Sequence, residues 1–289
     1  MYNIGILQLT QNLDDAVNGF KQGLCEAGID VKYHYLNADG NLSELPKLAN
    51  KLAETKVDLI FACSTPAAKA AVDLADHIPV VFTPVFDPVG VGLAKTMNQP
   101  GGKATGMAGM VKATDKISFI KCLLPTAKKV GVLFHTGDTN AMLETNNFRI
   151  AAAGTFELID LPISSPEDLS RLEEFLPSNL DALFVPIGRI IEENFATVVY
   201  YTDAINLPII ASHAPNVSAG ALGALVSNHT HLGKDCAIQA IQILQGSQPD
   251  SIPIGIVEQP EILLNSFVAC NLGIELPAEL INQAKEIYE

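Results

Sequence analysis

The residues best suited to bind a ligand are polar or aromatic and stand where predicted strands end. In open α/β sheets, ligands bind outside the carboxyl ends of the strands. The hydroxyl, amide, carboxylate and imidazole groups of these residues could hydrogen-bond a small polar molecule. Any strand that ends in a loop, however, is followed by some polar residues. The predicted ligand-binding residues are Gln8, Thr10, Ser64, Thr65, Phe86, Asp87, His135, Thr136, Asn140, Arg189, Ser212, His213 and Asn228.

Thr65-Pro66 predicts a well-specified helix start directly after a buried strand. We expect Thr65 to be the N-cap and Pro66 the first helical residue. The free N–H groups and the positive dipole end of such a helix suit a carboxylate or similar anion. The alternative is that Thr65 only caps its own helix, and the same turn can serve both roles.

Sequence signatures of catalysis and of metal binding are missing. The chain contains neither a G-x-S-x-G elbow nor a phosphate-binding loop that ends in Gly-Lys-Ser/Thr. His229 and His231 form a close pair, but no third zinc ligand lies near them in the sequence. The sequence therefore predicts no catalytic residue, no metal and no cofactor, although an acid–base pair assembled in space stays open.

Composition indicates a globular protein that avoids nucleic acid. The chain has 289 residues, 48% of them hydrophobic, and a formal net charge of −14. Such an acidic protein is repelled by phosphate backbones and by anionic lipid. The cysteines contain no C-x-x-C pair, which favours buried inert thiols over redox or metal roles.

Short apolar runs alternate with stretches of helical periodicity along the chain, which predicts parallel sheets covered by helices on both faces. The predicted helices include Asp14–Ala27, Ser43–Thr55 and Ala67–Ala75. The predicted strands are Ile4–Leu9, Val31–Leu36, Leu59–Cys63, Val80–Thr83, Val130–His135, Phe156–Leu161, Ala182–Val185, Ile209–Ala211 and Ala221–Val226.

Three strand sequences of the first half have counterparts in the second, in the same order and at nearly constant spacing. They are Ile4–Gln8 with Val130–Phe134, Val57–Phe61 with Leu180–Phe184, and Ile78–Phe82 with Leu207–Ala211. The repetition predicts an α/β fold of two doubly wound parallel-sheet lobes joined by a hinge.

The predicted domain bounds are 1–109 plus 229–252 for the N-lobe and 110–228 plus 253–289 for the C-lobe. A ligand cleft is expected between the lobes. The Gly-rich stretch from Pro100 to Met110 is the predicted connection, because glycine absorbs backbone rotation at low cost. An ordinary surface loop is the alternative interpretation.

Several sequence motifs together resemble one group of transporter components. They include Gly19-Phe20-x-x-Gly23-Leu24, Ser64-Thr65-Pro66-Ala67-Ala68, Asp87-Pro88-Val89-Gly90 and Pro100-Gly101-Gly102. The pattern is similar to the ABC-transporter substrate-binding proteins, in the group that includes tryptophan- and phenylalanine-binding lipoproteins. The resemblance runs from Ile4 to about Leu280.

This resemblance implies a fold similar to type I periplasmic binding proteins and an extracytoplasmic location, in the periplasm or lipid-anchored at the outer face of the membrane. It also implies hinge closure over an amino acid or related carboxylate, and delivery to a membrane permease by a monomeric protein. The chain enters a strand pattern directly after Met1, so we expect either that a leader has been removed from this sequence or that the protein is cytoplasmic. The motif positions that carry over are Gln8, Ser64, Thr65 and Asp87, with Thr65 near the ligand carboxylate.

The second half departs from the family pattern. Asp138-Thr139-Asn140-Ala141 stands where relatives show Glu-x-Asn-Ser, and Gly188-Arg189 stands where relatives often show Asp-Asn. If Arg189 faces the cleft, it should favour carboxylate or phosphate over ammonium, and if it faces solvent it is only a charged helix start.

Two other functions fit the same sequence. A ligand-sensing module of a receptor or regulator would share this fold, and permease or kinase genes nearby would separate the two. An enzyme of doubly wound fold is the third alternative, and it would need an assembled catalytic pair.

Overall fold

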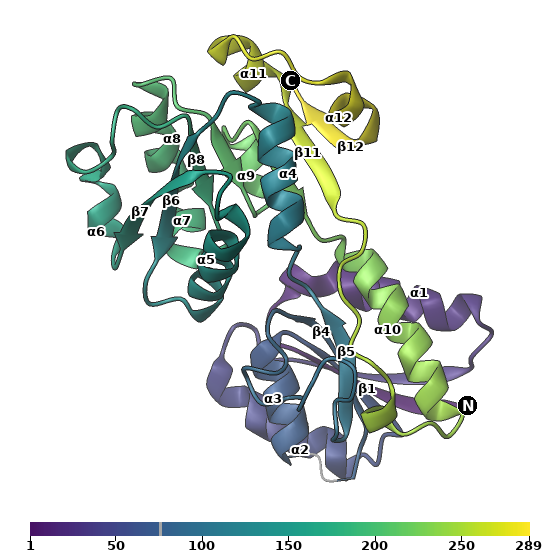
Figure 1. Cartoon of the computed structure of the whole chain (residues 1–289). Helices are drawn as coiled ribbons and strands as arrows, with labels where there is room; N and C mark the ends of the chain where they lie inside the picture. Colours follow the sequence, from purple (N-terminus) through teal and green to yellow (C-terminus); the bar gives the residue numbers. More distant parts are fainter. Residues whose placement is uncertain (75–76) are drawn as a thin grey trace. The chain divides into compact units, whose positions relative to one another are not determined.

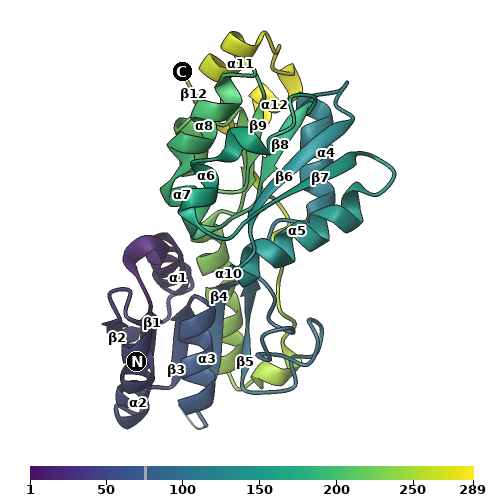
Figure 2. The same cartoon turned by 90° about the vertical axis from the view of Figure 1, so that its left-hand side faces the viewer.

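The computed structural model describes residues 1–74 and 77–289, which form two compact units. Unit 1 consists of Met1–Met110 and Ser227–Glu258. Unit 2 consists of Val111–Val226 and Gln259–Glu289. Each unit is a sheet with helices on both faces, and Figures 1 and 2 show the elements of each.

Unit 1 contains a five-stranded sheet in the order β2-β1-β3-β4-β5, and every pairing is parallel. Helices α2 and α3 cover one face, and α1 and α10 cover the other. The strands are β1 (Tyr2–Gln8), β2 (Val31–Asn37), β3 (Leu59–Cys63), β4 (Val80–Val85) and β5 (Ala104–Ala108). The helices are α1 (Asp14–Glu26), α2 (Leu45–Glu54), α3 (Thr65–Leu74) and α10 (His229–Leu244), with short 3-10 turns at Gln11–Leu13, Leu42–Glu44 and Pro249–Ser251.

Unit 2 contains a seven-stranded sheet in the order β12-β11-β10-β9-β8-β6-β7, in which only the β10–β11 pair of the described residues is antiparallel. The strands are β6 (Lys129–His135), β7 (Glu157–Ile163), β8 (Ala182–Val185), β9 (Ile209–Ala211), β10 (Gly223–Val226), β11 (Glu261–Asn265) and β12 (Ala284–Tyr288). The helices are α4 (Ala113–Leu123), α5 (Thr139–Ala152), α6 (Pro166–Leu169), α7 (Arg189–Glu193), α8 (Phe195–Asp203), α9 (Pro215–Ser218), α11 (Ser266–Leu272) and α12 (Ala278–Gln283), with a 3-10 turn at Leu172–Glu174.

The two sheets share one winding order. The order β7-β6-β8-β9-β10 in unit 2 repeats β2-β1-β3-β4-β5 in unit 1. The three repeated sequence pairs fall on β1 and β6, β3 and β8, and β4 and β9, which are equivalent strands. The predicted fold of two doubly wound parallel-sheet lobes is therefore confirmed.

The Gly-rich stretch is not a free loop throughout. Ala104–Ala108 forms the buried edge strand β5, so the expected connection is wrong over these residues. Glycine at position 106 allows β5 to pair with β4, because the Cβ atom of any other residue would lie 2.1 Å from the carbonyl oxygen of Phe82. Strands β11 and β12 were also missed, and the predicted helix end at Ala75 lies outside the described residues.

Helices α1 and α10 pack with almost no separation at two glycines. A Cβ atom on Gly19 would lie 2.0 Å from the carbonyl oxygen of Thr230, and one on Gly233 would lie 2.1 Å from that of Ala16. Figure 1 shows the two helices side by side. Gly19 belongs to one of the motifs that resemble the family, and the close approach of α10 explains why glycine stands at this position.

The cysteines divide by burial. Cys63 and Cys236 are buried, and burial raises the pKa of both thiols, as expected for inert cysteines. Cys25 and Cys270 are exposed, so the expectation of buried thiols is wrong for these two. All five are free of disulfide bonds.

Among residues 1–74 and 77–289, no helix combines the length and the apolar character that crossing a bilayer requires.

The α1–α10 contact generates the first prediction. Gly233→Ala should lower the free energy of unfolding by about 2 kcal/mol or more, because the added methyl group meets backbone that cannot move away cheaply. Urea unfolding measures the change. Gly102→Ala is the matched control, since a Cβ atom there meets no atom within 4 Å, and its effect should stay within about 0.5 kcal/mol. An equal loss in both variants would contradict the packing account.

Candidate ligand-binding site

The carboxyl end of the unit 1 sheet brings Gln8 and Ser64 to neighbouring strand ends. Gln8 pairs in register with Asn37 on β2 and with Cys63 on β3. The order of strands reverses between β1 and β3, so the connections after these two strands leave toward opposite faces. In doubly wound sheets this reversal point is where ligands bind.

Gln8 is buried, and a chain of hydrogen bonds fixes its amide. The Tyr35 hydroxyl donates to Gln8 Oε1 at 2.8 Å, and Gln8 Nε2 donates to Asp14 Oδ1 at 3.1 Å. Asn37 Nδ2 donates to the Tyr35 oxygen at 3.1 Å. Partial burial raises the pKa of Tyr35, so the phenol remains protonated as a donor. Gln8 is therefore held in one orientation.

Ser64, which links β3 to α3, is held in a strained conformation. Its φ is +98°, a backbone region that non-glycine residues rarely adopt. The Ser64 amide donates to the Thr83 carbonyl oxygen at 3.1 Å, and the Ala67 amide donates to Ser64 Oγ at 3.4 Å. Ser64 thus occupies the capping position, so the expectation that Thr65 is the N-cap is wrong by one residue.

Thr65 is the first residue of α3 and is half-buried. Within the described residues, its amide and its hydroxyl donate to no protein group. The amides of Ala67 and Ala68 are both used by Ser64. The start of α3 therefore leaves one amide and one hydroxyl open beside the strained residue.

Phe86 and Asp87 follow β4, and Asp87 shapes the turn there. Its Oδ1 accepts the Gly90 amide at 2.7 Å, and its carbonyl oxygen accepts the Val91 amide. A Cβ atom on Gly90 would lie 2.0 Å from Asp87 Oδ2, so a larger residue at position 90 would displace the Asp87 carboxylate. Half of the Asp87 carboxylate is thus committed to its own loop.

Two further predicted residues of unit 1 lie at helix starts. Thr10 precedes the 3-10 turn at Gln11–Leu13 but makes no side-chain cap bond. Asn228 caps α10, since its Oδ1 accepts the His231 amide at 2.9 Å.

In unit 2, His135 is the last residue of β6, Thr136 follows it, and Asn140 lies in the first turn of α5. The Thr136 amide and hydroxyl both donate to the Ile163 carbonyl oxygen, at 2.9 and 3.1 Å. The N-cap of α5 is Asp138, which accepts the amides of Asn140 and Ala141. The Asn140 side chain is exposed.

Arg189 begins α7 with its charge already paired. Its Nε donates to Glu193 Oε1 at 2.6 Å, and its side chain is 84% exposed. Glu193 raises the pKa of the guanidinium, which stays charged. The ion pair with Glu193, on the same helix, thus reduces the attraction of Arg189 for an anion. The Gly188-Arg189 sequence alone did not indicate this ion pair.

Ser212 and His213 follow β9. His213 Nδ1 lies 4.0 Å from Glu192 Oε2 and makes no hydrogen bond among the described residues, although the atom is buried. Ser212 belongs to a buried group that sequence reasoning missed. Its hydroxyl donates to Glu144 Oε1 at 2.6 Å and accepts from Lys116 Nζ at 2.8 Å.

Lys116 and Glu144 form a buried ion pair, and Glu144 Oε2 also accepts the Ile187 amide at 2.9 Å. The two residues stand on different helices, far apart in the chain. The available signal was a charged residue at an inward-facing position of each helix, and neither position belongs to a motif.

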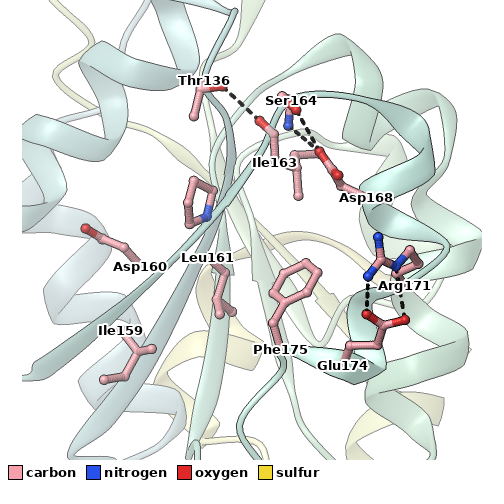
Figure 3. A pocket seen from close by; sticks show the side chains of 11 residues that line it. Thr136, Ile159, Asp160, Leu161, Ile163, Ser164, Asp168, Arg171, Glu174 and Phe175 are labelled. Carbon is pink, nitrogen blue, oxygen red and sulfur yellow. Dashed lines mark hydrogen bonds and ion pairs between the residues drawn. The ribbon is translucent and has the colours of Figure 1, made fainter.

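A separate groove of about 660 Å³ lies along the edge strand β7 of unit 2 (Figure 3). Thr136 is the predicted site residue that borders it. Polar side chains that line the groove bind one another: Asp168 accepts a hydrogen bond from Ser164, and Arg171 forms an ion pair with Glu174. The residues that line it are Thr136, Ile159, Asp160, Leu161, Pro162, Ile163, Ser164, Asp168, Arg171, Glu174 and Phe175.

Within the described part of the chain, no group of three or more His, Cys, Asp or Glu side chains is placed to hold a metal ion. The predicted residues thus gather at strand ends as hydrogen-bonding groups, which suit a small polar molecule.

Comparison with known proteins agrees with this arrangement. The family model described as "ABC transporter substrate binding protein" matches residues 3–288. This chain belongs to the ABC-transporter substrate-binding proteins. The resemblance stated from the motifs is confirmed.

One relative in this family is a tyrosine-binding protein of Clostridioides difficile. It is 32% identical over 270 residues, which cover 91% of this chain and 78% of the relative. A solved substrate-binding protein with adhesive properties from Clostridium difficile, in a ligand-free open form, has a TM-score of 0.91 at 27% identity. The match covers 100% of this chain and 99% of that one.

A second solved structure is a domain from Streptococcus pneumonia in complex with L-Trp. Its TM-score is 0.82 at 27% identity, with 99% of both chains covered. Neighbours of lower identity, among them inositol- and leucine-binding proteins, share the fold alone. The predicted similarity to type I periplasmic binding proteins is confirmed at the level of fold.

The strain at Ser64 generates the second prediction. Ser64→Val should lower the free energy of unfolding by about 2 kcal/mol, because a β-branched side chain is penalised at positive φ. Ser64→Gly should stay within about 1 kcal/mol of the wild type, since the relieved strain offsets the flexibility of glycine. Chemical denaturation checks both variants.

Ser178→Val serves as the control, because Ser178 is exposed and its φ is negative. If Ser64→Val and Ser178→Val were equally stable, the backbone at Ser64 would not be strained.

Proposed function

We propose that this substrate-binding protein is the solute-binding component of an ABC importer and captures an amino acid or related small carboxylate by hinge closure. The observation that carries the proposal is the open amide and hydroxyl of Thr65 at the start of α3, beside Gln8 and Ser64. A binding protein returns its ligand chemically unchanged, which separates it from an enzyme of the same fold.

The carboxylate of the ligand is assigned to unit 1. The N-terminus of α3 carries the positive end of the helix dipole, and a helix of this length has enough turns to express it. The Thr65 amide and hydroxyl would donate two hydrogen bonds, which are strong when the acceptor is charged. No side-chain cation is needed for this role.

Unit 2 contacts the remainder of the ligand in this proposal. His135, Asn140 and His213 supply hydrogen-bonding groups after its strands. The charge of Arg189 is compensated by Glu193, so it does not turn this side into a second carboxylate site. The ligand therefore carries one carboxylate, and its other end is polar or cationic.

The relatives support an amino acid as the ligand class, since one is a tyrosine-binding protein and one was solved with L-Trp. We assign the class and not the side chain, because the unit 2 residues that would select it differ from the family pattern at Ala141 and Gly188-Arg189. L-Tyrosine and L-tryptophan are the first probes.

The same family membership supports the setting in which the protein acts. It would work outside the cytoplasm, in the periplasm or lipid-anchored at the membrane, as a monomer that delivers its ligand to a membrane permease. Contact with the permease and release of the ligand would follow capture.

The third prediction tests capture. L-Tyrosine or L-tryptophan should raise the melting temperature, and ligand at 100 times its dissociation constant contributes about 2.7 kcal/mol. Calorimetric titration should show at least tenfold weaker binding by Thr65→Val, because one hydrogen bond to a charged acceptor is lost. Mass spectrometry should recover the ligand unchanged.

Thr55→Val is the matched control, since Thr55 follows α2, is exposed and bonds only the Lys51 carbonyl oxygen through its hydroxyl. It should bind like the wild type. The proposal fails if no amino acid or small carboxylate shifts the melting temperature, or if the added compound is chemically converted.

A further inference from the structure

The buried pair Lys116–Glu144 lies directly behind two strand-end loops of unit 2. The residues are 4% and 2% exposed, on α4 and α5 respectively. Placing two charges in the interior costs several kcal/mol per ion, and their attraction offsets this only with good geometry and further hydrogen bonds. A buried ion pair is therefore weak evidence for stability, and its position calls for another explanation.

Glu144 uses both oxygens to hold backbone and side chain of the two loops. Oε1 accepts the Lys116 ammonium and the Ser212 hydroxyl, and Oε2 accepts the Ile187 amide at 2.9 Å. The Ser212 hydroxyl in turn accepts from Lys116 Nζ at 2.8 Å. One carboxylate thus joins α4, the loop after β8 and the loop after β9.

Lys116 has further support on its apolar side. Its Nζ lies 5.7 Å from the centre of the Phe184 ring on β8, within the range of a cation–π contact. The ring itself stacks on Phe148 of α5 at 4.0 Å. The ammonium is thus fixed by a rigid aromatic pair, and the carboxylate that it binds is fixed with it.

The residues that Glu144 holds lead straight into proposed ligand contacts. Ile187 precedes Gly188-Arg189, and Ser212 precedes His213. The next amide along, that of Gly188, donates to Glu192 Oε1 at 2.9 Å. Two successive amides of the loop after β8 are therefore bound by carboxylates of the protein itself.

We infer that Glu144 is a positioning residue, held by Lys116, that sets the two loops of unit 2 for ligand binding. The inference rests on the proposed function, since it takes these loops as ligand contacts. It assigns the buried charges to loop geometry, whereas apolar residues of similar size could fill the same space at no loss of stability.

The test replaces the pair by Lys116→Met together with Glu144→Leu. The double variant keeps the volume apolar and leaves no buried charge, so its melting temperature should fall by no more than a few degrees, which is the cost of the unpaired Ile187 amide. The Ile187 amide loses its acceptor, so its hydrogen exchange in the ligand-free protein should be about tenfold faster. L-Tyrosine, or L-tryptophan if that is the probe bound, should bind about tenfold more weakly.

The matched control makes the same two substitutions on an exposed ion pair of unit 2, Arg171→Met with Glu174→Leu. It should leave both exchange at Ile187 and affinity unchanged. Ser212→Ala is the second variant if the double variant does not fold. It keeps the ion pair and should speed exchange of the His213 amide.

Unchanged exchange at these amides in a folded variant overturns the inference. So does a double variant that recovers both melting temperature and wild-type affinity, because the pair would then be structural only. The exchange measurement uses no ligand, so it stands even if neither amino acid binds, which is the separate failure of the proposed function.

Discussion

The reversal of strand order between β1 and β3 is the constraint on which the binding account depends. The carboxyl ends of neighbouring parallel strands lie at the same edge of the sheet. Where the connections after two such strands run to opposite faces, they leave a crevice between them. Gln8 and Ser64 stand on the two sides of this point. The sharp passage from β3 into α3 forces Ser64 to a φ of +98° and leaves the start of α3 facing the open edge. Strain of this kind persists only where surrounding structure enforces it.

The two units share one strand order, but the polar groups at the carboxyl ends of their strands differ in charge. In unit 1 the Thr65 amide and hydroxyl, at the start of α3, have no hydrogen-bond partner among residues 1–74 and 77–289. In unit 2 the amides of Ile187 and Gly188, at the equivalent reversal between β6 and β8, are bound by Glu144 and Glu192. An anion would therefore find donors in unit 1, while unit 2 has satisfied its own with carboxylates.

The fold could be predicted from the sequence because the same strand motifs occur in both halves of the chain. Three strand motifs recur in order, and each pair falls on equivalent strands of the two sheets. Strand β5 was missed because the glycines in and around it indicate a flexible connection in a sequence, whereas Gly106 lets β5 approach Phe82 closely. The N-cap was misplaced by one residue because Ser and Thr both cap helices, and only the backbone angle at Ser64 separates them. Lys116 and Glu144 lay beyond prediction, since their pairing depends on how α4 and α5 pack.

The central claim is that the carboxylate of the ligand binds at the start of α3. The most direct measurement follows the Thr65 amide by 15N–1H NMR during titration with L-tyrosine and with tyramine, which lacks the carboxylate. The account predicts a large Thr65 shift with L-tyrosine and neither binding nor a Thr65 shift with tyramine at the same concentrations. Equal binding of the two compounds, or L-tyrosine binding that leaves the Thr65 amide unmoved, would contradict it.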